Sequence, residues 1–172
     1  MVANMIPNRM YPITTSAFIN ITSEHQGCRY IIVGKGPDLE NMQELSKTHN
    51  EIIVVPGCSF EEMKSLYALS DIYVHGGREP ASTALVIGGI ASLPLISSHA
   101  VGCCLDCVED EVSGYVVKNC ASIKDWELAF KWMLDNRDRW HYMGSEARRK
   151  SKDLDVDVVV ESFINLIKRI CV

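Results

Sequence analysis

The residues best suited to chemistry lie in one loop between a predicted strand and a predicted helix, which runs from His75 to Thr83. The loop carries a charged pair, Arg78 and Glu79, and ends on two hydroxyl residues, Ser82 and Thr83. The first backbone amides of a helix have no partner within it and attract anions, so we expect those of Ser82 and Thr83 to face an anion. The same residues are equally compatible with an ordinary glycine-rich loop in which Arg78 and Glu79 form a surface ion pair.

Two earlier loops add groups that suit a phosphate. Arg9 follows the first predicted strand, and an arginine there can grip a diphosphate through paired N–H donors, although a lone surface arginine is often inert. Gly34 and Gly36 follow the second predicted strand, where glycines let the backbone approach a phosphate closely. The third glycine of the dinucleotide-binding fingerprint is not at this position, so a plain tight turn is equally compatible with the pair.

Short apolar runs that alternate with helical segments position these loops. Near-continuous apolar strands are typical of a parallel sheet with helices on both faces. Strict alternation predicts one Rossmann-like α/β domain over residues 1–172, with a doubly wound, six-stranded parallel sheet. Ligands bind at the carboxyl ends of such strands, where all three loops lie. The expected strands are Val2–Ile6, Arg29–Val33, Ile52–Val55, Asp71–Val74, Leu95–Ser97 and Tyr115–Val117.

Helix start signals separate the strands. Ser59 is followed three residues later by Glu62, which is a capping box, and Ser82 can cap the next helix. Helical periods predict the helices 13–22 and 39–48 before them, and three more near 123–134, 137–151 and 156–170.

Composition narrows the class of protein. A net charge of −5 over 172 residues argues against nucleic acid as a partner. Seven cysteines, an odd number, are most simply read as reduced thiols in the cytosol. The longest apolar run, 84–96, is interrupted by Gly88, Gly89 and Pro94, and falls short of the roughly 20 residues that span a bilayer. Cys103, Cys104 and Cys107 lack the second ligand pair of a closed zinc site, so no metal is predicted.

The motifs, taken in order, resemble the C-terminal, nucleotide-sugar-binding domain of GT-B-fold glycosyltransferases of family 4 (group 1), the retaining group that builds many bacterial polysaccharides. The resemblance covers nearly the whole chain. It depends on the opening strand and Arg9, Ile31–Pro37, Ser65–Val74, Arg78–Pro80, Pro94–Ile96, Gly102, Val108–Asp110, Ser113–Gly114 and Met143–Arg148.

The resemblance implies a role for each loop. Arg9 falls on the basic position that holds the donor diphosphate, and Glu79 on the first glutamate of a pair, which binds sugar hydroxyls. These two are the expected catalytic residues. The expected donor-binding residues are Gly34, Gly57, Cys58, Arg78, Ser82 and Thr83.

The implied activity is transfer of a sugar from a nucleoside-diphosphate sugar to a glycan or lipid-linked acceptor, in polysaccharide biosynthesis. No metal or cofactor is expected, because fixed cations and helix-end amides can stabilise the leaving diphosphate. The strand-like start at Val2 favours a domain of a longer enzyme, whose acceptor-binding N-terminal domain lies outside this chain. The chain alone is then not expected to transfer sugar. We expect a cytoplasmic protein, with peripheral contact at the inner face of the membrane only through that other half.

Departures from the family pattern keep a second reading open. Asn4 stands where a second basic residue is expected, Ile87 replaces the second glutamate, which takes the ribose diol, and Cys103 replaces the second glycine of a pair. These changes favour a degenerate, non-catalytic binding or interaction module of the same fold. A nucleotide-sugar epimerase is a weaker third reading, because partners for its catalytic acids are not evident.

Overall fold

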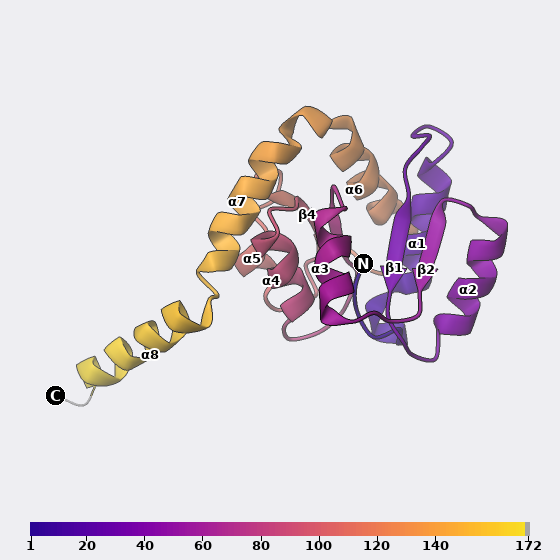
Figure 1. The fold of residues 1–172 in the computed structure, drawn as a ribbon. Helices are drawn as coiled ribbons and strands as arrows, with labels where there is room; N and C mark the ends of the chain where they lie inside the picture. The colour runs from indigo at the N-terminus through magenta and orange to yellow at the C-terminus, as the bar shows by residue number, and fades with distance from the viewer. Residues whose placement is uncertain (171–172) are drawn as a thin grey trace.

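The computed structural model describes residues 1–170, in which parallel strands are covered by helices on both faces (Figure 1). The strands are β1 (Tyr30–Val33), β2 (Ile52–Val55), β3 (Tyr73–His75), β4 (Leu95–Ser98) and β5 (Gly114–Val117). The α-helices are α1 (Tyr11–Ile21), α2 (Leu39–Thr48), α3 (Phe60–Ala68), α4 (Thr83–Ile90), α5 (Cys104–Cys107), α6 (Ile123–Asp135), α7 (Trp140–Lys152) and α8 (Val156–Ile170), with short 3₁₀ helices η1 (Pro7–Arg9) and η2 (Arg137–Arg139).

The strands form two parallel sheets rather than one. β1 pairs with β2, and β3, β4 and β5 pair in that order. The predicted α/β fold with parallel strands and helices on both faces is therefore confirmed, and the prediction of a six-stranded sheet is wrong.

The expected first strand, Val2–Ile6, is reduced to one bridge between Val2 and Val33. Its backbone still runs along β1, since the Ala3 amide donates to the Val33 carbonyl at 3.1 Å. Beyond that point the amide of Ile6 bonds the carbonyl of Asn4 at 3.0 Å, which turns the chain into η1. The segment meets β3 through a side chain, because the Tyr73 hydroxyl donates to the Val2 carbonyl at 3.2 Å. The segment is thus joined to β1 by its backbone and to β3 by a side chain, and the two sheets stay separate.

Neighbouring residues of β3, β4 and β5 point into two different cores, because successive side chains of a strand alternate between faces. Val74, Ile96 and Val117 pack in the core formed with α1 and α6. Their neighbours Tyr73, Leu95 and Val116 pack in the second core, with α3, α4, α5 and α7. Burial on both faces explains why these strands read as continuous apolar runs.

The helix starts follow their sequence signals. Ser59 and Glu62 form the predicted capping box of α3, and the Ser82 side chain accepts from the Leu85 amide at the start of α4. The short helix α5 was not predicted, because its four residues are too few to show a helical period.

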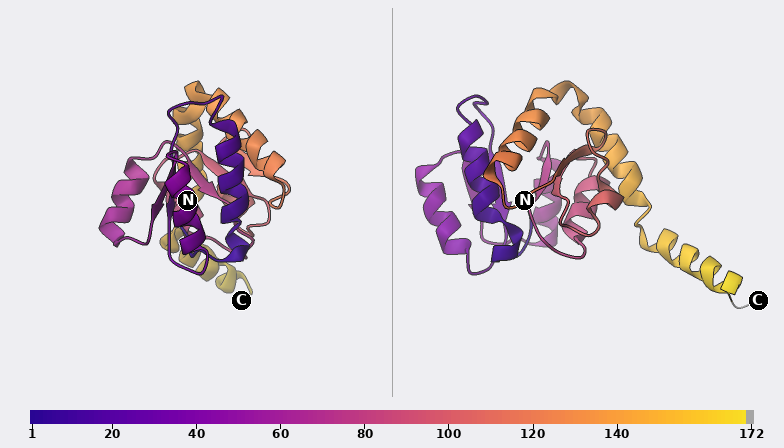
Figure 2. Two further views of the ribbon diagram at one scale, coloured as in Figure 1. Left: turned by 90° about the vertical axis from the view of Figure 1, so that its right-hand side faces the viewer. Right: turned by 180° about the vertical axis from the view of Figure 1, so that it is seen from behind.

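The last helix, α8, points away from the other elements in Figure 1 and in the rear view of Figure 2. All of its residues are exposed, including large apolar side chains such as Phe163. Within residues 1–170, no helix combines the length and apolar character needed to cross a membrane.

Candidate functional site

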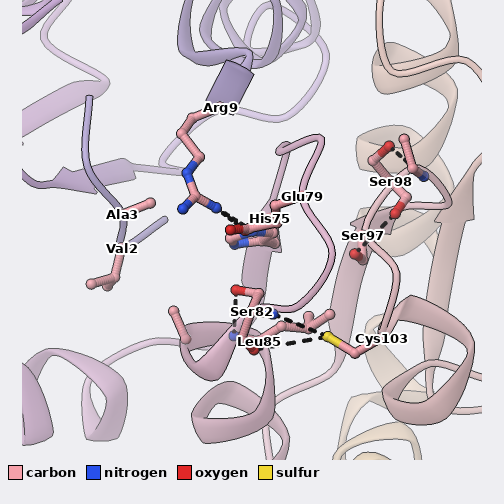
Figure 3. A network of polar contacts seen from close by, with 12 residues as sticks. Val2, Ala3, Arg9, His75, Glu79, Ser82, Leu85, Ser97, Ser98 and Cys103 are labelled. Atoms are coloured by element: carbon pink, nitrogen blue, oxygen red, sulfur yellow. Dashed lines mark hydrogen bonds and ion pairs between the residues drawn. The ribbon is translucent and has the colours of Figure 1, made fainter. Parts of the chain in front are cut away.

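Arg9, His75 and Glu79 meet at the carboxyl end of β3 (Figure 3). The guanidinium Nη1 of Arg9 forms an ion pair with Glu79 Oε1, and the same nitrogen lies 3.4 Å from His75 Nε2. His75 Nε2 also hydrogen-bonds Glu79 Oε1. The side chains of Arg9 and Glu79 are only 18% and 14% exposed, and that of His75 is fully buried. The two predicted catalytic residues therefore contact each other directly.

His75 is neutral in this cluster. Burial, and then the Arg9 guanidinium and the N-terminal ammonium, lower the pKa of His75 from 6.5 to about 3. Its contact with Glu79 is therefore a hydrogen bond and not an ion pair at neutral pH. On the other side of the ring, Nδ1 lies 3.3 Å from the Tyr73 hydroxyl. A neutral ring that donates from Nε2 to Glu79 leaves Nδ1 unprotonated beside the Tyr73 hydroxyl, whose own proton goes to the Val2 carbonyl.

The charges of the cluster cancel, because the guanidinium of Arg9 and the carboxylate of Glu79 are paired and His75 is neutral. Arg9 uses one nitrogen for these contacts, and its Nε and Nη2 make no hydrogen bond within residues 1–170. Arg9 can therefore still donate to a ligand, but the pair brings no net positive charge to it.

The start of α4 differs from the expectation for its amides. The Ser82 amide donates to Cys103 Sγ at 3.2 Å, so it is not available to an anion (Figure 3). The Ser82 hydroxyl accepts from the Leu85 amide at 3.3 Å. The amides of Thr83 and Ala84 have no hydrogen-bond partner in the part of the chain that the structure describes. The free amides at this helix start are thus those of Thr83 and Ala84, and the expectation for Ser82 is wrong.

Cys103 contacts both backbone groups of Ser82, because its Sγ accepts from the amide at 3.2 Å and lies 4.0 Å from the carbonyl oxygen. The pKa of Cys103 is lowered to about 6, first by a hydrogen bond from the Cys107 thiol and then by the Ser82 amide, against the opposing effect of burial. The pKa of Cys107 is raised in turn, because its proton is held by that bond and by burial. The replacement of a glycine by Cys103 was visible in the sequence, but its contact with Ser82 depends on how α5 packs against α4.

An open pocket of about 580 Å³ lies beside the carboxyl ends of β1 and β2. Three predicted donor-binding residues, Gly34, Gly57 and Cys58, line it. Asn4 and Lys35 line it as well, and Ala84 brings the start of α4 to its wall. The structure thus joins loops that are up to 80 residues apart in the sequence around one space, as the sheet topology predicts.

Close backbone packing requires glycine at position 34, and a left-handed backbone conformation favours it at position 57. A Cβ on Gly34 would lie 2.0 Å from the Ala3 carbonyl oxygen. Gly57 has a φ of 86°, in the left-handed region, and a Cβ there would lie 2.6 Å from Cε of Lys35. Gly34 therefore admits the N-terminal segment, rather than a phosphate, to close contact with its Cα.

Arg78 and Thr83 lie outside the residues that form the pocket lining. Arg78 Nε donates to Cys120 Sγ at 3.0 Å, and its amide donates to the Asn8 carbonyl at 2.8 Å. Ile87 is half-buried and packs against the second core. Arg78 thus ties the loop to two other segments of the protein, and the position of Ile87 is filled by apolar packing.

Metal ligands do not gather within residues 1–170, where no three His, Cys, Asp or Glu side chains are placed to hold an ion.

The family is decided by a match between residues 1–150 and the model of the glycosyl transferases group 1. The chain belongs to this family. The match covers every strand and the whole of the site described above, and it confirms the resemblance that the motifs predicted.

Similar proteins include the phosphatidylinositol N-acetylglucosaminyltransferase GPI3 subunit of Saccharomyces cerevisiae, 19% identical over 124 residues. That match takes in 70% of this chain, which spans 27% of the length of the curated relatives it matches.

Solved structures share the fold at low identity. The C-terminal domain of the group 1 glycosyl transferase LpcC from Francisella tularensis superposes with a TM-score of 0.76 at 14% identity, over 88% of this chain and 82% of that one. S. aureus TarM gives a TM-score of 0.84 at 15% identity, over 96% of this chain and 34% of its own. The pneumococcal O-GlcNAc transferase GtfA, in complex with UDP and GlcNAc, gives 0.82 at 14% identity, over 99% and 35%.

Proposed function

We propose that this chain is the donor-binding domain of a retaining glycosyltransferase, which transfers a sugar from a nucleoside-diphosphate sugar to a glycan or lipid-linked acceptor. The observation that carries the proposal is the pocket at the ends of β1 and β2, since it gathers Gly34, Gly57 and Cys58 in a member of the group 1 family. Its volume of about 580 Å³ falls within the range of small-molecule sites.

The neighbouring cluster supplies the expected catalytic groups. Glu79 is 14% exposed and can hydrogen-bond sugar hydroxyls with the oxygen that Arg9 and His75 leave free. Arg9 can donate from Nε and Nη2 to the leaving diphosphate. Fixed donors of this kind stabilise charge as it develops on a leaving group, and the step then requires neither a metal nor a cofactor.

Attack on the sugar needs an acceptor held in line with the donor. We propose that a second domain outside this chain binds the acceptor, and that the 172-residue chain alone transfers no sugar. The whole protein would then act in the cytoplasm in polysaccharide biosynthesis, with contact to a membrane surface through that domain. Radiolabelled donors with glycan acceptors test this, and turnover above background by the purified chain would contradict it.

Calorimetric titration of the chain with UDP, GDP and ADP, and then with their sugars, tests the donor site. Three of the similar solved structures are complexes that contain UDP, so UDP is the first choice. We expect saturable one-to-one binding of one nucleoside diphosphate. Failure of all three to bind would exclude the proposal.

A second candidate is a non-catalytic module of the same fold. It is favoured by two observations in which site groups are satisfied internally: the Ser82 amide is bound by Cys103, and the charge of Arg9 is paired with Glu79. Under this candidate none of the three nucleotides binds.

A further inference from the structure

The pocket at the ends of β1 and β2 contains a single charged residue, Lys35, among the described residues that line it. The others are apolar, glycine, Asn4 and Cys58. A pocket with one positive charge and no negative charge favours an anionic ligand, because a buried or half-buried anion is stabilised by an opposite charge nearby.

The two cations beside the site differ in how their charge is balanced. Arg9 is paired with Glu79, and both side chains are largely buried. Lys35 is exposed, and it forms neither an ion pair nor a side-chain hydrogen bond within residues 1–170. A diphosphate that enters the pocket therefore meets net positive charge at Lys35 and not at the Arg9–Glu79 pair.

Backbone hydrogen bonds hold the segment around Lys35 in place, and they fix the position from which its side chain extends. The Lys35 carbonyl accepts from the Met5 amide at 2.8 Å, and the amide of Gly34 donates to the Val55 carbonyl at 3.1 Å. The stem of Lys35 then crosses Gly57, where the missing Cβ leaves room for Cγ, Cδ and Cε. The stem of Lys35 thus lies against Gly57, and both residues line the pocket.

We infer that Lys35 binds a phosphate oxygen of the donor nucleotide and supplies the net positive charge that the Arg9–Glu79 pair does not. The inference rests on the proposed donor site and adds to it a residue on which affinity for the diphosphate depends. A lysine ammonium is a compact point charge with three donors on a flexible stem, which suits contact with a phosphate oxygen.

The test is calorimetric titration of UDP and of uridine into the wild-type chain and Lys35→Met, at low and at high salt. We expect UDP to bind Lys35→Met about tenfold more weakly at low salt, with a smaller dependence on salt, because a charge-assisted hydrogen bond is lost. The affinity ratio of UDP to uridine falls by the same factor. Lys35→Arg keeps most of the affinity, because it keeps the charge.

Lys47→Met is the matched control, since Lys47 is exposed and paired with Glu44 on α2, outside the pocket lining. It should bind UDP like the wild-type chain. Thermal unfolding of each variant shows whether it is folded. Equal UDP affinity of folded Lys35→Met and wild type overturns the inference and leaves the donor site standing. No binding of UDP, GDP or ADP to the wild-type chain overturns both.

Discussion

The cluster of Arg9, His75 and Glu79 and the pocket beside Gly34 and Gly57 lie next to each other but are built in opposite ways. The side chains of the cluster are largely buried, and the charges of Arg9 and Glu79 balance one another. The pocket is open, its shape comes from backbone and glycines, and within residues 1–170 its one charged lining residue, Lys35, forms no ion pair. Conspicuous charged residues at the end of a strand can therefore serve first to hold loops in place, while a less conspicuous lysine keeps its charge free beside the pocket.

Loss of charge inside the cluster should produce the largest effect. Glu79→Gln leaves the mostly buried guanidinium of Arg9 without its partner, and we expect it to lower the free energy of unfolding by about 3 kcal/mol. Chemical denaturation measures this, with Lys35→Met as the comparison, expected within about 0.5 kcal/mol of wild type. The double variant Arg9→Met/Glu79→Gln should lose less than the sum of its single variants. Equal stability of Glu79→Gln and Lys35→Met would show that the charges of the cluster stabilise the fold no more than the charge of Lys35 does.

The buried histidine predicts acid sensitivity for the cluster. Because the folded pKa of His75 is about 3 and the unfolded value 6.5, the unfolded chain binds the extra proton first as pH falls. Stability is therefore present above pH 6.5 and is lost progressively toward pH 3.

Between pH 6 and pH 5 the wild-type chain should lose about 1 kcal/mol more than His75→Gln, because the variant has no imidazole to protonate. Denaturation curves at the two pH values measure the difference, and the other histidines are common to both proteins. Parallel loss in the two proteins would show that His75 titrates normally in the fold.

Features of the fold that depend on local interactions could be predicted from the sequence, and features that depend on distant segments could not. The capping residues Ser59 and Ser82 and the strand Ile52–Val55 were predicted correctly, because their signals are local. The strand Val2–Ile6 was not, because whether a strand extends depends on its neighbours. The segment bonds Val33 and Lys35 on one side and meets β3 through the Tyr73 side chain on the other.

The candidate site divides in the same way. The gathering of Gly34, Gly57 and Cys58 follows from the sheet topology, which alternation in the sequence predicts. The availability of the Ser82 amide could not be predicted, because Cys103 reaches it from a segment 21 residues later. Lys35 stood in the sequence between two glycines, but its position beside Gly57 requires the parallel pairing of β1 and β2.

Substitution of Cys103 should produce the smallest effect, because it changes only whether the Ser82 amide is available to the ligand. Cys103→Gly should release the Ser82 amide to the ligand and raise UDP affinity about threefold, the size of one ordinary hydrogen bond. Cys103→Ser keeps an acceptor at this position and should bind UDP like the wild-type chain. Calorimetry distinguishes the two, and equal affinities for both variants would show that the Ser82 amide does not face the nucleotide.

The most direct test of the account is a titration of the isotopically labelled chain with UDP, followed by backbone amide NMR. If the pocket holds the nucleotide, the largest shifts fall on Gly34, Lys35, Gly57, Cys58 and Ala84, and Lys35→Met reduces the affinity obtained from them. Shifts confined to segments away from these five residues, or no shifts at saturating UDP, would contradict the account.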